Sequence, residues 1–285
     1  MPAYTYNTRD DPNRRSGKGV DNSKVFETHF PGKDMPLGLN MIDIQGGENY
    51  RIGSYIKDSA PVPGKPKTFN TTFVVGTWYN TTLNNGGCTW LDMSKWNQVL
   101  QFGRKNAQGR SNEAFLQEYD IKFERAFESV PRVVVWFHWL NINARSPPCV
   151  EVRADDVTTH GFKLRYDAPW NESFGPAFWT EVHECKVSWI AVPQDQPNVT
   201  AGSREVFRDG EYRPEYKLEV EFDQPFSRAP RVLAALSKIS MLSKGVLRLE
   251  VTVEDVTTKG MTLVVKNWGG CDLLRVNVDY IAVLD

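Results

Sequence analysis

Polar and apolar residues alternate along much of the second half of the chain. Residues 217–222 read Lys-Leu-Glu-Val-Glu-Phe, and residues 247–254 and 276–281 alternate in the same way. A period of two places successive side chains on opposite faces of a strand, so each stretch is predicted to be a half-buried β-strand. No stretch has the spacing of an amphipathic helix. The pattern therefore predicts an all-β protein built of antiparallel sheets.

These strands belong to a repeat. Asp156-Val157-Thr158-Thr159-His160-Gly161 returns as Asp255-Val256-Thr257-Thr258-Lys259-Gly260, an offset of 255 − 156 = 99 residues. The same offset relates Pro131-Arg132-Val133 to Pro230-Arg231-Val232. Two copies in register indicate a duplicated domain. In each copy the six-residue motif is predicted to be a structural turn, capped by its polar side chains and with its glycine at a positive φ.

The first hundred residues contain a diverged third copy. Arg51 and Asp58 are seven residues apart, as are Arg248 and Asp255, and both Trp78–Trp90 and Trp268–Tyr280 span twelve residues. We therefore predict an N-terminal extension at residues 1–24, lying along a neighbouring part of the molecule. Three six-stranded antiparallel β-sandwich modules follow, at residues 25–95, 103–192 and 201–285.

Composition narrows the classes of function. The formal net charge of −1 argues against a nucleic-acid partner, and no apolar run is long enough for membrane insertion. Residues 1–24 contain no signal-peptide core, which leads us to expect a cytoplasmic protein or one secreted without a signal peptide. With four histidines and no paired ligand motif, we expect no metal, no other cofactor and no catalytic constellation.

Two features have alternative interpretations. Cys149 and Cys185 lie in one repeat and could form a disulfide or remain reduced; the missing signal peptide favours reduced thiols. Trp136, Phe137 and Trp139, together with His138, form the densest aromatic cluster of the chain. We interpret that cluster as a strand with apolar residues on both faces, partly covered by the next module, in preference to a ligand platform.

Together these motifs resemble a known family. The Pro-Arg-Val strand, the strand that contains Leu-Arg, the Asp-Val-Thr-Thr-x-Gly turn and the closing Val-Ser-Trp-Ile-Ala strand resemble the H-type lectin domain of the snail agglutinin and of discoidin. The resemblance is good over residues 103–285 and weak over residues 25–95. It implies six-stranded sandwiches that associate in threes, here as a module–module pseudo-trimer or a small homo-oligomer. It also implies metal-free binding of galactose or N-acetylgalactosamine where adjoining domains meet.

The resemblance also implies particular sugar-binding residues. A neutral sugar needs charged hydrogen-bonding groups for its hydroxyls and an aromatic plane for its C–H face. Module by module, the implied residues are Asp21, Arg51, Trp78 and Tyr79; then Asn112, Trp170 and Trp179; and finally Arg248 and Trp268 with Asp209 or Glu211 as the acidic partner. The middle module departs from the pattern, because Cys149 stands 99 residues before Arg248. That loss predicts a weak, retuned or inactive middle site.

The sequence therefore predicts a non-catalytic, multivalent lectin whose partners are glycans of the galactose type. Two alternatives remain. The scaffold could bind a protein partner as a structural or accessory protein, as the lost arginine suggests. Alternatively, the modules could be appendages of an enzyme that acts on carbohydrate, although 285 residues leave little room for a catalytic domain. Arg248 could also be only the cross-strand partner of a glutamate.

Overall fold

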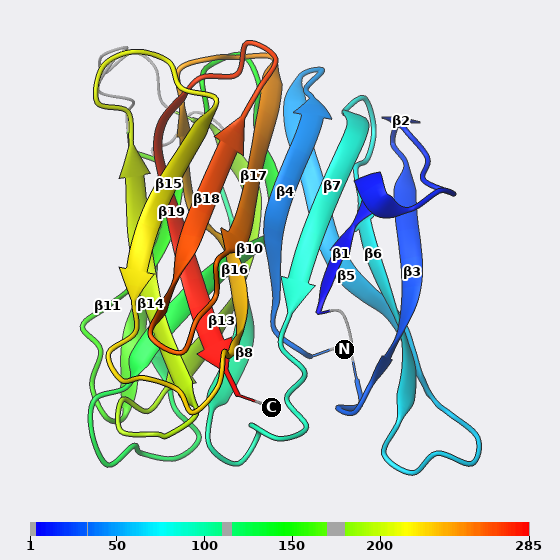
Figure 1. Cartoon of the computed structure of the whole chain (residues 1–285). Coiled ribbons are helices and arrows are strands. Elements are labelled where there is room, and N and C mark those ends of the chain that lie inside the picture. Colours follow the sequence, from blue (N-terminus) through cyan, green and yellow to red (C-terminus); the bar gives the residue numbers. More distant parts are fainter. Residues whose placement is uncertain (1–3, 33, 110–115, 170–179, 285) are drawn as a thin grey trace.

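A computed structural model describes residues 4–32, 34–109, 116–169 and 180–284 (Figure 1). Within these residues the chain forms nineteen β-strands and one short 3-10 turn, η1 (Thr8–Asp10). The all-β prediction is confirmed. The described part of the chain contains no helix that is long and apolar enough to cross a membrane.

The strands form three antiparallel sheets. Sheet A has the order β1 (Thr5–Asn7), β7 (Thr82–Trp90), β4 (Leu37–Gln45), β17 (Val246–Glu254), β18 (Gly260–Asn267) and β15 (Glu215–Glu221), with β2 (Gly17–Lys18) beside β7. Sheet B has the order β3 (Asp21–Thr28), β6 (Phe69–Gly76), β5 (Asn49–Pro61), β10 (Arg132–Asn143), β13 (Val182–Val192) and β8 (Gln101–Gln108). Sheet C has the order β14 (Val199–Phe207), β19 (Leu273–Val283), β16 (Arg231–Met241), β11 (Cys149–Asp155), β12 (Gly161–Asp167) and β9 (Leu116–Lys122).

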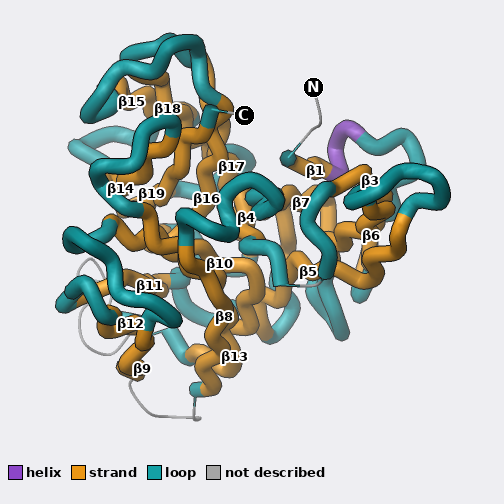
Figure 2. Tube along the Cα trace, turned by 90° about the horizontal axis from the view of Figure 1, so that it is seen from below, coloured by secondary structure: helices purple, strands orange, loops and turns teal. Residues whose placement is uncertain are grey.

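Each sheet is shared by two modules. We call β1–β7 module 1, β8–β13 module 2 and β14–β19 module 3; every module gives strands to two of the three sheets. The modules join through three seams, where β5 pairs with β10, β11 with β16 and β17 with β4. Figure 2 shows the three groups of strands arranged around β4, β10 and β16. The seams close a ring, so the single chain has the pseudo-threefold arrangement of a cyclic trimer.

The N-terminal residues are part of this ring. Residues 5–7 pair with β7, and β3 begins at Asp21, so much of the segment expected to be an extension contributes strands to module 1. The reason is Tyr6, which is 2% exposed and packs in one apolar cluster with Phe73 and Trp90. Burying an aromatic ring of this size stabilises the pairing of even a three-residue strand.

An apolar core lies where the three modules meet. Gly38, Trp136 and Ala235 occupy equivalent positions, each five residues before a seam residue of its own strand. Trp136 is completely buried in a cluster that draws residues from all three modules. A Cβ atom at Gly38 would lie 2.4 Å from Ala235 Cβ and 2.9 Å from Trp136 Cβ. One indole therefore fills the pseudo-threefold axis, and the two equivalent positions have to be small. The sequence predicted that neighbouring modules would partly cover the aromatic cluster of residues 136–139, and this prediction is confirmed for Trp136.

Polar groups also join the modules near the axis. The backbone N–H of Leu37 donates to Ser188 Oγ (3.0 Å), and that of Val135 donates to Asp279 Oδ2 (2.7 Å). Ser188 and Asp279 are equivalent, because they stand opposite Trp136 and Ala235 in their sheets. One cross-module hydrogen bond thus recurs at two of the three junctions, with a different acceptor each time.

The repeated Asp-Val-Thr-Thr-x-Gly motif is a turn, but its glycine differs from expectation. The positive φ belongs to Asp156 (51°) and Asp255 (49°), whereas neither motif glycine has one. Gly161 instead comes close to a neighbouring strand, because a Cβ atom there would lie 2.1 Å from the Ile121 carbonyl oxygen. Gly260 has the same relation to the carbonyl of Val220, at 2.3 Å. The motif therefore needs glycine for close backbone packing rather than for a left-handed conformation.

Gly161→Ala is expected to destabilise the protein by about 1–3 kcal/mol, because the added methyl group forces β9 and β12 apart. Gly260→Ala should cost a similar amount, since the contact is repeated in module 3. The exposed neighbour supplies the control, His160→Ala. Guanidinium denaturation followed by far-UV circular dichroism measures the three variants. A midpoint for Gly161→Ala equal to that of His160→Ala would contradict the close-packing explanation.

Candidate functional site

Arg51 lies at the seam between modules 1 and 2. It is on β5, opposite Asn141 of β10. Its Nη1 donates to Asn80 Oδ1 (2.7 Å), and its Cζ lies 5.2 Å from the centre of the Tyr79 ring. Tyr79 has a φ of 55° and is 80% exposed. A bulky residue held in that conformation, with its ring in solvent beside a guanidinium, is typical of a binding site.

Module 2 supplies polar neighbours to this site. Asn49 Nδ2 donates to Asn141 Oδ1 at 3.0 Å. In the opposite orientation of the Asn49 amide this donation is lost, and its oxygen instead accepts from Arg51 Nη2 and His183 Nε2, both at 3.1 Å. The Nε of Arg51 is buried and has no hydrogen-bond partner within the described residues. The Arg51 site, made of Arg51, Tyr79, Asn80, Asn49, Asn141 and His183, therefore combines donors, acceptors and an aromatic ring from two modules.

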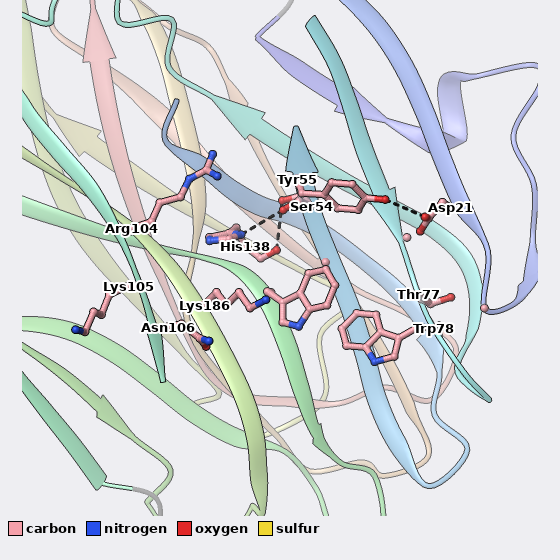
Figure 3. A pocket seen from close by; sticks show the side chains of 14 residues that line it. Asp21, Ser54, Tyr55, Thr77, Trp78, Arg104, Lys105, Asn106, His138 and Lys186 are labelled. Atoms are coloured by element: carbon pink, nitrogen blue, oxygen red, sulfur yellow. Dashed lines mark hydrogen bonds between the residues drawn. The ribbon is translucent and has the colours of Figure 1, made fainter. Parts of the chain in front are cut away.

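Trp78 and Asp21 lie beside this site, in a groove on the outer face of sheet B. The groove has a volume of about 740 Å³ and crosses the seam between modules 1 and 2 (Figure 3). Asp21 accepts a hydrogen bond from the Tyr55 hydroxyl at 3.0 Å. Burial and this hydrogen bond raise the pKa of Tyr55 to about 12. The four residues implied for the first module are thus divided: Arg51 and Tyr79 touch each other, whereas Asp21 and Trp78 line the adjoining groove.

Arg248 is held differently at the seam between modules 3 and 1. Its Nε lies 3.3 Å from Asp43 Oδ1, and its Nη1 donates to the Gly269 carbonyl at 2.9 Å. Asp43 is buried and also accepts from Asn84 and Asn85, both at 3.0 Å. The carboxylate beside Arg248 is therefore Asp43 of module 1 and not one of the two residues implied by the resemblance.

Those two acidic residues lie elsewhere. Asp209 forms an ion pair with Arg213 (3.2 Å), and Glu211 is exposed. Trp268 is half-buried and lines a separate hollow with Arg9 and Glu250. The residues implied for the third module therefore lie in three separate parts of the structure. The carboxylate that pairs with Arg248 could not be identified from the neighbouring sequence, because Asp43 and Arg248 are 205 residues apart.

The third seam has no arginine. Cys149 stands opposite Ser240, at the position that Arg51 and Arg248 occupy in the other seams. It is buried, as are all four cysteines, and each is a free thiol. Burial raises the pKa of Cys149, so the group there is a neutral thiol at physiological pH. Asn112, Trp170 and Trp179, the residues implied for this module, lie outside the described residues.

Trp139 contradicts the interpretation of its strand. Trp136 and Phe137 are completely buried, as predicted, but Trp139 is only half-buried and lines the groove. The cause is an irregularity of the β10–β13 register between Phe137 and Trp139. Such a bulge reverses the alternation of side chains, so Trp139 points away from the core that contains Phe137. A prediction based on simple alternation therefore misses the partial exposure of Trp139.

Several residues of the candidate sites were missed from the sequence. Asn80 and Asp43 contact the two seam arginines, and Asn141 and His183 are neighbours of Asn49 beside Arg51. Of these four residues, Asn141 and His183 come from another module and Asp43 from a distant strand. The only local signal was Asn80, which follows Trp78 and Tyr79 directly. Within the described residues no cluster of three or more histidine, cysteine or acidic side chains could hold a metal ion.

Fold and candidate sites together define a class of protein: a ring of β-sandwich modules with polar candidate sites around an arginine at two of its three seams. Comparison with known families agrees, because residues 118–192 and 217–283 each match the H-type lectin domain. The chain belongs to the H-type lectin domain family, in tandem copies, as the sequence motifs predicted. The domains of this family bind carbohydrate.

Comparison with individual proteins adds a relative. A Fuscovulum blasticum protein described as "ATP synthase subunits region ORF 7" is 35% identical over 94 residues. The aligned part covers 30% of this chain and 82% of that protein. No solved structure matches the chain.

Proposed function

We propose that this protein is a multivalent, non-catalytic lectin that binds glycans ending in galactose or N-acetylgalactosamine. The observation that carries the proposal is the Arg51 site, where the guanidinium lies beside the exposed Tyr79 ring at a seam between modules. A charged donor fixes sugar hydroxyls, and an aromatic ring takes the apolar face of the sugar.

Arg248 with Asp43 supports a second sugar site. The buried Asp43 carboxylate orients the Arg248 guanidinium, which is partly exposed and can donate to a sugar hydroxyl oxygen. Single sugar sites of this kind bind weakly. Two sites on one rigid ring raise the affinity for a multivalent surface without any new contact.

Replacing both seam arginines tests the proposal. Arg51→Ala combined with Arg248→Ala is expected to weaken binding to galactose-type glycans at least tenfold, because each change removes a charge-assisted hydrogen bond. The measurement is a glycan array, with soluble N-acetylgalactosamine as competitor and isothermal titration for the best ligand. Arg213→Ala, which removes an exposed arginine paired with Asp209, is the matched control. Unchanged binding by the double variant would exclude these sites.

One observation favours a second candidate function. The seam of Cys149 and Ser240 has no arginine, so the ring is not a set of three identical sugar sites. A structural or accessory protein that binds another protein through the lectin scaffold would tolerate such a loss. A folded sample that binds no glycan on the array supports this alternative.

A further inference from the structure

Each of the three sheets carries an equivalent row of four residues that face one another across neighbouring strands. Every row crosses a seam two positions along the strand from Arg51, Arg248 or Cys149. The rows, read from the outer strand toward the next module, are Asp21, Gly76, Gly53 and Trp139 on sheet B; Glu215, Lys266, Glu250 and Met41 on sheet A; and Leu116, Asp167, Glu151 and Lys238 on sheet C. Equivalent positions in the three rows can therefore be compared directly.

An acidic residue and a tryptophan accompany the row on sheets A and B. On sheet B they are Asp21, which begins the row, and Trp78, which follows the β6 residue of the row by two positions. On sheet A the same two positions are held by Glu215 and Trp268. Structural equivalence thus identifies Glu215 as the acidic counterpart of Asp21, which the spacing along the sequence did not indicate.

The row on sheet C has lost these side chains. Leu116 stands at the acidic position, and Pro169 stands at the position of the tryptophans. Cys149 stands at the position of the seam arginine. At these three positions sheet C therefore offers neither the charged groups nor the aromatic ring that a sugar site needs.

The row on sheet A lines a hollow beside Arg248. The hollow has a volume of about 550 Å³, and Glu215, Glu250 and Trp268 are among its lining residues. Arg248 and Glu250 project from the same face of β17, two residues and thus about 7 Å apart. The Nη1 of Arg248 donates to the carbonyl of Gly269, the residue after Trp268. A sugar in the hollow would therefore lie next to Arg248.

Trp268 supplies the aromatic ring that Arg248 lacks. Tyr79, whose ring lies beside Arg51, is replaced at the equivalent position by Gly269. Trp268 is half-buried and lines the hollow. The ring available to the apolar face of a sugar at this seam is thus that of Trp268.

Arg9 brings a second guanidinium to the hollow from the N-terminal segment. It lies in η1, where Asn7 Oδ1 accepts from the Arg9 backbone N–H (2.9 Å). The buried Thr8 anchors the same turn, because its Oγ1 accepts from the Gly86 N–H at 2.9 Å. The Nη1 and Nη2 of Arg9 donate to the two carboxylate oxygens of Glu250, at 3.1 and 2.6 Å. A guanidinium has more N–H donors than this pair uses, and the Arg9 side chain is 48% exposed, so donors remain for a ligand hydroxyl.

The charges that line the hollow balance one another. Arg9 is paired with Glu250, and Lys266 Nζ lies 3.1 Å from Glu215 Oε2. Two positive and two negative side chains leave no net charge, so the hollow favours a neutral ligand over an ion. A hydroxyl group both donates and accepts, and can therefore bind beside either pair.

We propose that the hollow on sheet A is the second sugar site of the ring, and that Arg9 of the N-terminal segment is one of its binding residues. This assignment rests on the lectin function proposed above and specifies where its second site lies. The sugar places its apolar face against Trp268, accepts a hydrogen bond from Arg9 and donates one to Glu215. The ring then has two sites, one at the Arg51 seam and one on sheet A.

The number of bound sugars tests the assignment. Native mass spectrometry of the whole protein, at a concentration of methyl N-acetylgalactosaminide that just saturates it, should show two bound sugars. Arg9→Ala and Trp268→Ala should each show one, because the affinity of the altered site falls at least tenfold. Arg51→Ala should also show one, and Arg9→Ala/Arg51→Ala none. Arg275→Ala, which removes an exposed arginine from β19 of sheet C, is the matched control and should show two.

A purely structural role of Arg9 gives a different result. Arg9 joins the N-terminal segment to Glu250 of module 3, so Arg9→Ala is also expected to lower the midpoint of denaturation, whereas Trp268→Ala leaves that ion pair intact. Two bound sugars in either of these variants, or a single one in the wild-type protein, would overturn the assignment and leave the Arg51 site in place. A folded wild-type protein that binds no sugar would contradict the lectin function itself.

Discussion

Trp136→Ala should destabilise the whole ring by about 3–5 kcal/mol, the usual cost of truncating a large buried aromatic residue. Trp136 has no exposed surface, and its Nε1–H donates to the Asp279 carbonyl at 2.9 Å. Gly38 and Ala235, the equivalent residues around the axis, are too small to fill the cavity left behind. All three modules lose contacts at once, because the surrounding cluster draws on each of them.

Denaturation by guanidinium, followed by far-UV circular dichroism, measures this effect. The half-buried Trp78 gives the matched control, since Trp78→Ala removes the same side chain from the groove surface. We expect a single transition for both variants, because every sheet is shared between two modules. The axis explanation would be wrong if the two variants had equal midpoints, or if one module of Trp136→Ala unfolded well before the others.

The second large effect is the dependence of stability on pH through Asp279. Burial raises the pKa of this carboxyl to about 6 from 3.8, although Ser203, Ser237 and the Val135 N–H all donate to it. The folded protein therefore holds a proton more tightly than the unfolded chain does. Stability from this group is present below pH 4 and is lost as the pH rises from about 4 to about 6. The difference between the two pKa values corresponds to about 3 kcal/mol.

Asp279→Asn should remove this dependence. Relative to wild type, the variant is expected to gain up to about 3 kcal/mol of stability between pH 4 and pH 6, and to keep that gain at higher pH. Denaturation curves at half-unit steps from pH 4 to pH 8 give the difference, in which the titration of the other groups cancels. The exposed Asp120 provides the control, as Asp120→Asn. A difference curve without slope between pH 4 and pH 6 would refute the role of Asp279.

Parts of the candidate site could be predicted from the sequence because they are local. The spacing from Arg51 to Asp58 and from Arg248 to Asp255 identified two arginines that occupy equivalent seam positions. The offset of 99 residues between the copies identified Cys149 as the residue at the equivalent position of the third seam. Such spacings survive duplication, because a strand and the turn that follows it keep a fixed number of residues.

The partners of these arginines could not be predicted in the same way. Asp43 lies 205 residues from Arg248, and Asn141 and His183 reach the Arg51 site from another module. Hydrogen bonds across a seam join strands that are remote in the chain, and nothing in the local pattern of either strand records the register between them. Trp139 was misplaced because a bulge reversed the alternation from which its burial was inferred.

The sequence by itself determined the all-β fold, the duplicated unit, the family and the positions of Arg51, Arg248 and Cys149, since periodicity and spacing are properties of short segments. The tertiary structure alone decided that the modules close into a ring around Trp136, that Arg248 meets Asp43, and that a groove lies on sheet B. Each of those features depends on which strand edges pair and which small residues, such as Gly38 and Gly53, leave room for an indole. Such packing is settled only when the whole chain is folded.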